Sequence, residues 1–510
     1  MTDRVESSQR ASTAGWIPLA IGLSAVILLW DLLELPQLLD FRGFTFNDQG
    51  SNLTINYLVA HGYRPIIDFG YPYGLLAILA NMAWFRALPL TPLGYQAASI
   101  TCQLGVACAI ARTARALELR PIQLAFLFVA IGRAVTPTYW NLAHGLEAVL
   151  ICFALAEQAR GSRANALALT TAAVFAKPAI GYIYSALLLT LMALAAYRRR
   201  TFAPAVWLKQ IKPAAIVGIS LIAILGIVFG VDVLWMGAFP TTGMAAYRAR
   251  NFGFFTGTGS LFWHPAGANW HYYAGTVIGM WAVATAYLIW AAIPAGQRLW
   301  EDLGTTSDSI EMRRDETVFS CALLHLAFIF LLFGNPVAWN SCSYLLIAGA
   351  AAVPIDYRPR RYAFCALVVI TAGTYYALVV GSISLWRSMN RSPATANLFS
   401  TPKLQDEWVR VLTLSKGRRV AAFHYAGAVE LMYPEFKPLI GTYFCEGMTT
   451  PVEIQREAAR IESADVVVMP ASTSSAFCNS YPQTPETDRA LAPFKQTVQG
   501  EYFSIYERAR

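Results

Sequence analysis

The chain has 510 residues, of which 56% are hydrophobic and only 14% are charged, and its mean hydropathy is +0.43. These values exclude a soluble globular protein and indicate a polytopic membrane protein. The formal net charge of +8 does not indicate nucleic-acid binding, because most basic residues lie in short segments between hydrophobic stretches, where membrane topology accounts for them.

Hydrophobic segments of roughly 17 to 25 residues predict about twelve membrane helices. The first runs from Trp16 to Leu33 and is interpreted as a retained helix, because it is long and lacks a small-residue cleavage site. The later segments lie at about 71–88, 92–111, 121–139, 143–158, 164–177, 179–197, 213–232, 271–293, 317–334, 341–354 and 362–382.

Arginine and lysine gather between these segments, and such clusters are typical of cytoplasmic loops. They occur at residues 4–10, 112–120, 160–163, 198–212, 298–314 and 358–361. From the third cluster onward all fall on one side, which places Lys177, the loop 233–270 and everything after residue 383 outside. The second cluster conflicts with this orientation unless 71–88 or 92–111 is a partial, re-entrant element. An inside N-terminus and an outside C-terminus require an odd number of spans.

The first outer loop, residues 34–70, is polar and rich in glycine and aromatic residues. It contains two carboxylates, Asp48 and Asp68, together with His61 and Arg64. Acids and a cation held against a bilayer are suited to chemistry at the boundary between water and lipid.

This loop resembles that of the membrane glycosyltransferases of the GT-C class. Those proteins have an acidic residue early in the first outer loop, then a Gly-Tyr-Arg segment that ends in Asp-Phe, and a Tyr-Pro pair before the second helix. The matching positions are Asp48, Gly62, Tyr63, Arg64, Asp68, Phe69 and Pro72. The family usually has adjacent Asp and Glu at the first site, whereas Asp48 is followed by Gln49. A metal bridged by adjacent acids is therefore not supported.

The resemblance implies sugar transfer from a polyprenyl-phosphate donor. Such a reaction needs a carboxylate that takes the acceptor's proton and cations that stabilise the departing phosphate. Asp48 is expected to be the general base, and Asp68 to orient it or bind acceptor hydroxyls. The expected phosphate ligands are Arg64, Lys177, Arg248 and Arg250, and the expected substrate or lipid contacts are Tyr63, Tyr71, Trp263, His264 and Trp270.

Several of these residues also have a structural interpretation. Asp68 could cap a helix that begins near Gly70, or bind backbone amides in a turn. Lys177 could extend to the lipid head groups, and the aromatic residues of loop 233–270 could form an interfacial belt. Glu147 lies inside a predicted span, where a carboxylate needs a partner, and Lys177 or Arg133 is expected to supply it.

From about residue 385 charged residues and prolines return, which predicts a separate outer domain over residues 385–510. Helices are predicted at 402–416 and 452–462, and strands at 419–424, 437–444, 465–470 and 501–507. This alternation predicts a small α/β domain with a mostly parallel sheet. Cys445 and Cys478 stand alone in this domain and form either a disulfide or two free thiols.

The predicted fold is therefore an α-helical polytopic membrane domain of about 11–13 spans over residues 1–384, followed by an α/β domain outside the bacterial inner membrane. The expected function is sugar transfer to an envelope glycan, lipid or protein on the outer face of that membrane. No cofactor is assigned, and a divalent metal is left open.

Two other functions remain open. A transporter or flippase of lipid-linked saccharides would place its ionisable groups near the middle of the bilayer, between related halves. A polymerase or ligase of lipid-linked glycans would need essential arginines in loop 233–270, namely Arg248 and Arg250.

Overall fold

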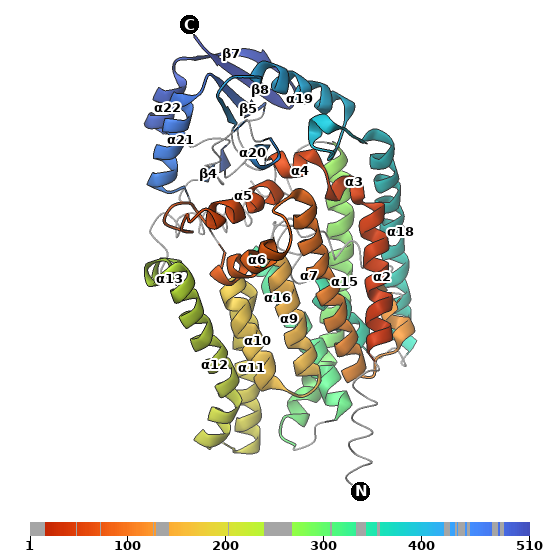
Figure 1. The fold of residues 1–510 in the computed structure, drawn as a ribbon. Helices are drawn as coiled ribbons and strands as arrows, with labels where there is room; N and C mark the ends of the chain where they lie inside the picture. The colour runs from red at the N-terminus through yellow and green to blue at the C-terminus, as the bar shows by residue number, and fades with distance from the viewer. Residues whose placement is uncertain are drawn as a thin grey trace.

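A computed structural model describes most of the chain. The described residues are 16–46, 48–71, 73–125, 127–128, 142–201, 203–238, 268–305, 309–332, 343–353, 358–422, 429–433, 436, 444–445, 449–471, 478–479 and 484–509. They form a bundle of long apolar helices with a small sheet-containing domain at one end (Figure 1). The predicted fold class, a helical membrane protein followed by a small domain of helices and strands, is confirmed.

The bundle is built from long helices whose positions follow the predicted hydrophobic segments. They are α2 (Ile17–Leu33), α7 (Pro92–Ala116), α9 (Leu142–Ala159), α10 (Arg163–Ala176), α11 (Pro178–Arg199), α12 (Pro204–Phe229), α15 (Ala268–Asp302), α16 (Ile310–Leu332), α17 (Ser343–Ala352) and α18 (Arg358–Ser388). Within the described residues, α7, α9, α11 and α12 are long and apolar enough to cross a membrane.

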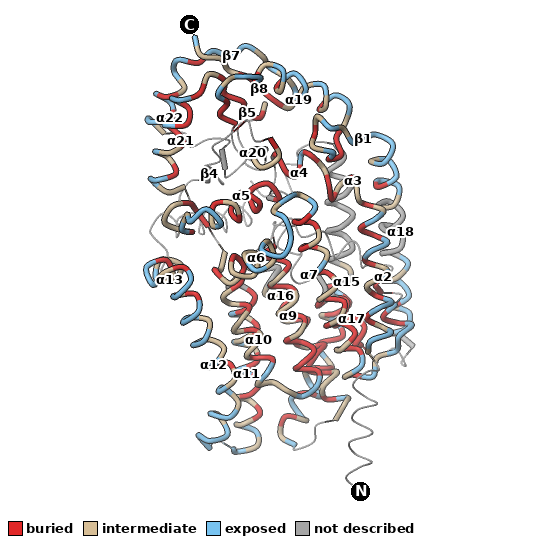
Figure 2. Tube along the Cα trace, viewed as in Figure 1, coloured by how far each residue is buried: buried red, intermediate tan, exposed pale blue. Residues whose placement is uncertain are grey.

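The helices differ in how deeply they are buried. The apolar window of α9 is 78% buried, whereas that of α12 is 11% buried, and Figure 2 shows this contrast between the centre and the edge of the bundle. The outward side chains of α12 include Ile219 and Ile227. In a bilayer such side chains meet acyl chains, so their exposure carries no hydrophobic cost.

A layer of short helices separates the bundle from the C-terminal domain (Figure 1). It contains α3 (Leu35–Leu38), α4 (Phe41–Phe46), α5 (Asp48–Ala60), α6 (Leu75–Ala87) and α13 (Val231–Ala238). The predicted outer loop 34–70 is thus largely helical.

The structure favours the alternative in which 71–88 is a partial element. Helix α6 has 13 residues, a length of about 20 Å at 1.5 Å per residue, and the hydrocarbon core is about 30 Å thick. The chain turns through Leu88–Thr91 before Pro92 begins α7. A partial element at this point removes the orientation conflict that the arginines at 112–120 presented.

The basic clusters converge at the end of the bundle opposite the C-terminal domain. Arg112 and Arg160 pair with Glu157 at 2.8 Å and 2.9 Å. Arg298 forms a two-point pair with Asp315, at 2.6 Å and 2.7 Å. The grouping of these clusters on one side agrees with the sequence prediction.

The C-terminal domain has a four-stranded sheet in the order β3 (Val420–Ala422), β5 (Val466–Pro470), β8 (Phe503–Arg508) and β7 (Phe494–Gln499). Only the β3–β5 pair is parallel, and β5–β8 and β7–β8 are antiparallel. The prediction of a mostly parallel sheet is therefore wrong. It failed because β7 was missed: this edge strand is largely exposed and lacks an apolar alternation.

The remaining elements of this domain are short strands and the helices that cover the sheet. They are β1 (Asn390–Arg391), η2 (Pro393–Thr395), β2 (Phe399–Ser400), α19 (Pro402–Ser415), α20 (Val429–Met432), β4 (Phe444–Cys445), α21 (Pro451–Ser463), β6 (Cys478–Asn479) and α22 (Pro485–Leu491). The predicted strand at 437–444 lies outside the described residues except for Phe444.

The C-terminal domain and the layer of short helices share a hydrophobic core. Trp408 of α19 is fully buried, and its ring centroid lies 5.2 Å from that of Phe41 in α4. The backbone N–H of Phe399 donates to the carbonyl of Leu39 at 2.8 Å. These contacts hold the C-terminal domain directly against the segment that carries Asp48 and Asp68.

Candidate site between the bundle and the C-terminal domain

The turn after α5 is organised by one carboxylate. Asp68 accepts a hydrogen bond from the backbone N–H of Arg64 at 2.7 Å, and the backbone N–H of Ile66 donates to the carbonyl of Phe69 at 2.7 Å. Ile66 has a φ of 70°, a left-handed conformation that costs a β-branched residue on the order of 1–2 kcal/mol. The Asp68 carboxylate therefore helps to hold a strained turn.

The side chain of Arg64 lies between two acids. Its Nη1 is 3.0 Å from Oδ2 of Asp232, in the first turn of α13, and its Nε is 3.8 Å from Asp68. The Arg64 and Asp232 side chains are about half exposed, at 51% and 54%. An exposed pair of this kind contributes roughly 0–1 kcal/mol, so Arg64 can exchange Asp232 for another anion at little cost.

The C-terminal domain reaches the same turn through α21. The guanidinium carbon of Arg456 lies 4.6 Å from the centre of the Tyr63 ring, and its Nη2 donates to the carbonyl of Asp68. Glu453 accepts a hydrogen bond from the backbone N–H of Gly70 at 3.0 Å. Glu453 is itself fixed by the capping box that it forms with Thr450 at the start of α21. Three contacts from α21 therefore hold the turn in place.

A second ionisable group lies where α9 meets the junction of α10 and α11. Lys177 places its Nζ 3.3 Å from Oε2 of Glu147 and 3.0 Å from Nδ1 of His144. His144 and Glu147 share one face of α9 because they are three residues apart. The Lys177 side chain is only 12% exposed, so it does not extend to the lipid head groups.

The segment that leads into α6 connects the two groups. The Tyr73 ring meets the His144 ring edge-on at 5.5 Å, and the backbone N–H of Gly74 donates to the carbonyl of Ala176 at 2.9 Å. A Cβ at Gly74 would lie 2.0 Å from the carbonyl oxygen of Phe175. Only glycine allows this approach, which brings the segment after Asp68 against the Lys177 group.

The structure brings together some of the predicted site residues. Tyr63, Arg64 and Asp68 lie in the first group. Tyr71 is buried beside Tyr73, with ring centroids 5.7 Å apart, and Tyr73 meets His144 of the Lys177 group. Burial raises the pKa of Tyr71, so its phenol stays protonated.

Other predicted residues lie outside the description. Asp48 is the first residue of α5 and Trp270 lies in α15, but the side chains of both are outside the described part. Arg248, Arg250, Trp263, His264 and Pro72 lie outside it entirely.

The structural alternatives for two residues can now be compared with the contacts. The helix-capping alternative for Asp68 is wrong, because α6 begins at Leu75 with Gly74 as its N-cap and no side-chain cap. The turn alternative is confirmed by the Arg64 N–H bond. The predicted pairing of Glu147 with Lys177 is also confirmed, and Arg133 lies outside the described residues.

Sequence reasoning missed four residues that contact the site. They are Tyr73, Asp232, Glu453 and Arg456. Asp232 stood at the end of a predicted span, and the Thr450–Glu453 spacing indicated only a helix start. No local pattern marks Arg456, because its role depends on a contact with Asp68, 388 positions away.

Within the described part of the chain, no group of three or more His, Cys, Asp or Glu side chains gathers at metal-binding distance.

No protein-family model and no curated protein sequence matches the chain. Among solved structures, the chain is similar to ArnT from Cupriavidus metallidurans, whose crystal structure is bound to undecaprenyl phosphate. The identity is 13%, the TM-score is 0.46, and the match covers 97% of this chain and 98% of that chain. A likeness this distant assigns neither a family nor a reaction.

Proposed function

We propose that the chain is a membrane glycosyltransferase that moves a sugar from a polyprenyl-phosphate donor to an envelope glycan, lipid or protein outside the bacterial inner membrane. One observation carries the proposal. The short segment from Arg64 to Gly74 connects two groups of ionisable residues, and both lie where the apolar bundle meets the C-terminal domain. We infer that a lipid carrier presents its phosphate at this boundary.

The position of the Lys177 group along α9 favours transfer over transport. His144 and Glu147 lie in the first two turns of α9, whereas Glu157 near its end pairs with the opposite basic face. Glu147 lies about 15 Å from Glu157 along α9, but Lys177 and Arg199 lie at opposite ends of the 22-residue helix α11, about 33 Å apart along its axis and so about one hydrocarbon thickness. A relay for transport is expected near the middle of the bilayer, whereas this group lies toward the C-terminal domain.

The proposed reaction assigns a part to each group. The acceptor hydroxyl attacks the anomeric carbon of the donor sugar, and Asp48 takes the hydroxyl proton. The bond from that carbon to the phosphate oxygen breaks, and its electron pair leaves with the polyprenyl phosphate. Asp68 acts by holding the turn that presents Arg64.

Cations near the phosphate would favour the products. The donor is a phosphodiester with one negative charge, and the departing polyprenyl phosphate is a monoester that gains a second. We propose that Arg64 and Lys177 meet that charge, because preorganised cations stabilise such a leaving group more than the donor. Arg248 and Arg250 are proposed to join them.

The test is a lipid-linked sugar profile of cells that express only the Asp48→Asn variant. We expect the polyprenyl-phosphate sugar to accumulate and the modified envelope product to disappear, at normal protein levels. The matched control is Asp406→Asn, the same change on the exposed face of α19, which should leave the profile unchanged. An Asp48→Asn strain with a wild-type profile would refute the proposal.

A further inference from the structure

A pocket of about 270 Å³ opens at the end of the bundle away from the C-terminal domain. It lies between the start of α10, the end of α11, the start of α12 and the start of α16. Its lining residues are Gly161, Arg163, Met192, Ala195, Ala196, Arg199, Thr201, Val206, Trp207, Gln210, Met312, Arg313 and Glu316. None of these residues belongs to the site described above.

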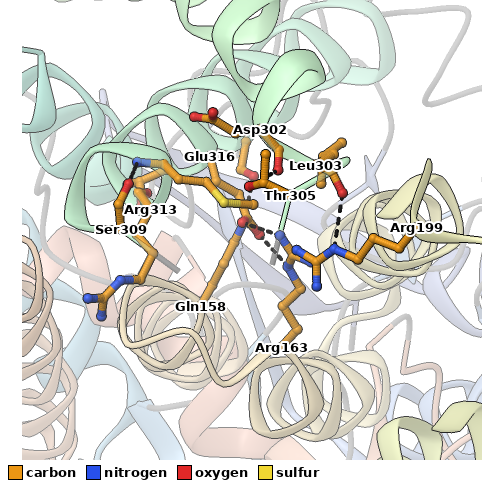
Figure 3. Close-up of polar contacts among 12 residues, drawn as sticks. Gln158, Arg163, Arg199, Asp302, Leu303, Thr305, Ser309, Arg313 and Glu316 are labelled. Atoms are coloured by element: carbon orange, nitrogen blue, oxygen red, sulfur yellow. Dashed lines mark hydrogen bonds and ion pairs between the residues drawn. The ribbon is translucent and has the colours of Figure 1, made fainter. Parts of the chain in front are cut away.

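The lining of this pocket carries more positive than negative charge. It contains three arginines and one acid, Glu316. That acid is already bound: Arg163 holds both its oxygens, at 2.8 Å and 2.5 Å, and Gln158 donates to it at 2.9 Å (Figure 3). Glu316 is therefore already bound by Arg163 and Gln158.

Arg199 is the cation most available to a ligand. Its Nε donates to the carbonyl of Leu303 at 3.1 Å (Figure 3), which fixes the plane of the guanidinium group. Within the described residues no carboxylate lies at ion-pair distance from Arg199. A guanidinium group held in place by a neutral acceptor keeps its full charge and its terminal N–H donors for an anion.

The rest of the pocket is mixed, with Thr201 and Gln210 as polar members and several apolar side chains. Met192, Ala195, Val206 and Met312 line it, and Trp207 stands at its edge on α12. Tryptophan favours the depth of the lipid head groups. The adjoining surface of α12 is exposed and apolar, so an acyl chain can lie along it. A lipid can use both the polar lining and this apolar surface, whereas a small soluble anion can use only the polar lining.

We propose that this pocket binds the phosphate-bearing head group of an anionic phospholipid from the leaflet opposite the C-terminal domain. Arg199 donates to the phosphate oxygens, and Trp207 packs beside the glycerol region. The site is independent of the proposed transfer reaction.

The test is a titration of the purified full-length protein with phosphatidylglycerol and with phosphatidylcholine, with bound lipid counted by native mass spectrometry. We expect wild-type protein to bind phosphatidylglycerol at least fivefold more tightly than phosphatidylcholine. Arg199→Gln should remove that preference. The matched control is Arg198→Gln, because Arg198 is exposed, stacks on Trp300 at 4.8 Å and does not line the pocket.

A second variant keeps the test decisive if Arg199→Gln fails to fold. Ala196→Leu fills the pocket without removing charge, and it should also weaken phosphatidylglycerol binding at least fivefold. The proposal would be overturned if wild type, Arg199→Gln and Ala196→Leu all had the same ratio of phosphatidylglycerol affinity to phosphatidylcholine affinity. Displacement of the lipid by millimolar glycerol 3-phosphate would overturn it as well, because the ligand would then be a soluble phosphate.

Discussion

At the residue scale, Lys177 is a buried cation whose position is fixed by two neighbouring side chains. Its ammonium group lies against Glu147 on one side and His144 on the other. The pair with Glu147 neutralises the charge inside the bundle, and the imidazole accepts a further hydrogen bond. Such an arrangement fixes the position of the cation, although a buried pair adds little net stability.

Breaking this pair should be costly. Glu147→Gln leaves the Lys177 charge without its carboxylate, and we expect the free energy of unfolding to fall by about 3–5 kcal/mol. Thermal unfolding in detergent measures this. The double variant with Lys177→Met should recover much of the loss but should not transfer sugar. A double variant as unstable as Glu147→Gln alone would contradict the pairing.

Asp40 provides a pH-dependent effect at the same scale. Burial raises its pKa from 3.8 to about 6, at the point where the chain pairs with Phe399 of the C-terminal domain. Below about pH 4 the carboxyl is protonated in both the folded and unfolded states, and above about pH 6 it is ionised in both. Stability should therefore fall as the pH rises from 4 to 6.

The expected loss is about 1–2 kcal/mol, because the side chain is partly exposed to water. Asp40→Asn should flatten the dependence of the melting temperature on pH over this interval, and Asp406→Asn should leave it unchanged. An Asp40→Asn variant with the wild-type pH dependence would contradict the role of burial.

At the scale of elements, α21 covers the candidate site on the side of the C-terminal domain. Arg456 contributes a cation–π contact and a charged hydrogen bond to the turn at 63–68, which together are worth about 2–4 kcal/mol. The strained turn thus depends on the C-terminal domain as well as on Asp68.

Removing the Arg456 contacts should loosen the turn at 63–68 without unfolding the bundle. We expect Arg456→Gln to speed amide hydrogen exchange at residues 61–71 at least tenfold, while exchange in α9 stays unchanged. Arg410→Gln is the control, since Arg410 is exposed on α19. Unchanged exchange at 61–71 in Arg456→Gln would show that the Arg456 contacts are not needed to hold the turn.

The short ladder between β4 and β6 bears on the two outer cysteines. Its register pairs Cys445 with Cys478 in antiparallel strands, where directly opposed Cα atoms lie about 4.5–5.5 Å apart. Disulfides span this distance, so the disulfide alternative is favoured. In denatured protein without reductant, maleimide should label neither of these two, and it should label both after reduction. Labelling of both before reduction would refute the bond.

The sequence predicts the helices of the whole molecule better than their contacts. Long apolar runs located α9 and α11 to within a few residues, because hydrophobicity alone decides which segments enter a bilayer. It left open whether 71–88 crosses completely, since that composition is apolar although helix α6 begins only at Leu75. Sheet direction was misjudged, because the polar edge strand β7 shows no period-two pattern.

The candidate site was predictable only in part. The acids and Arg64 stood in one recognisable loop, and the Glu147–Lys177 pair followed from the cost of a lone carboxylate in a membrane. Arg456 and Asp232 could not be found, because their relation to Arg64 and Asp68 is created by folding. Within the helical bundle, the paired basic residues gather at one end and the candidate site lies at the other.

The most direct test of this account is the binding of polyprenyl phosphate, the product common to every donor sugar, to purified full-length protein by native mass spectrometry. We expect one molecule to bind wild type, and Arg64→Gln to bind it at least tenfold more weakly, about 1.4 kcal/mol. Arg198→Gln should bind as wild type does. Equal binding by all three proteins would contradict a donor-phosphate site between the bundle and the C-terminal domain.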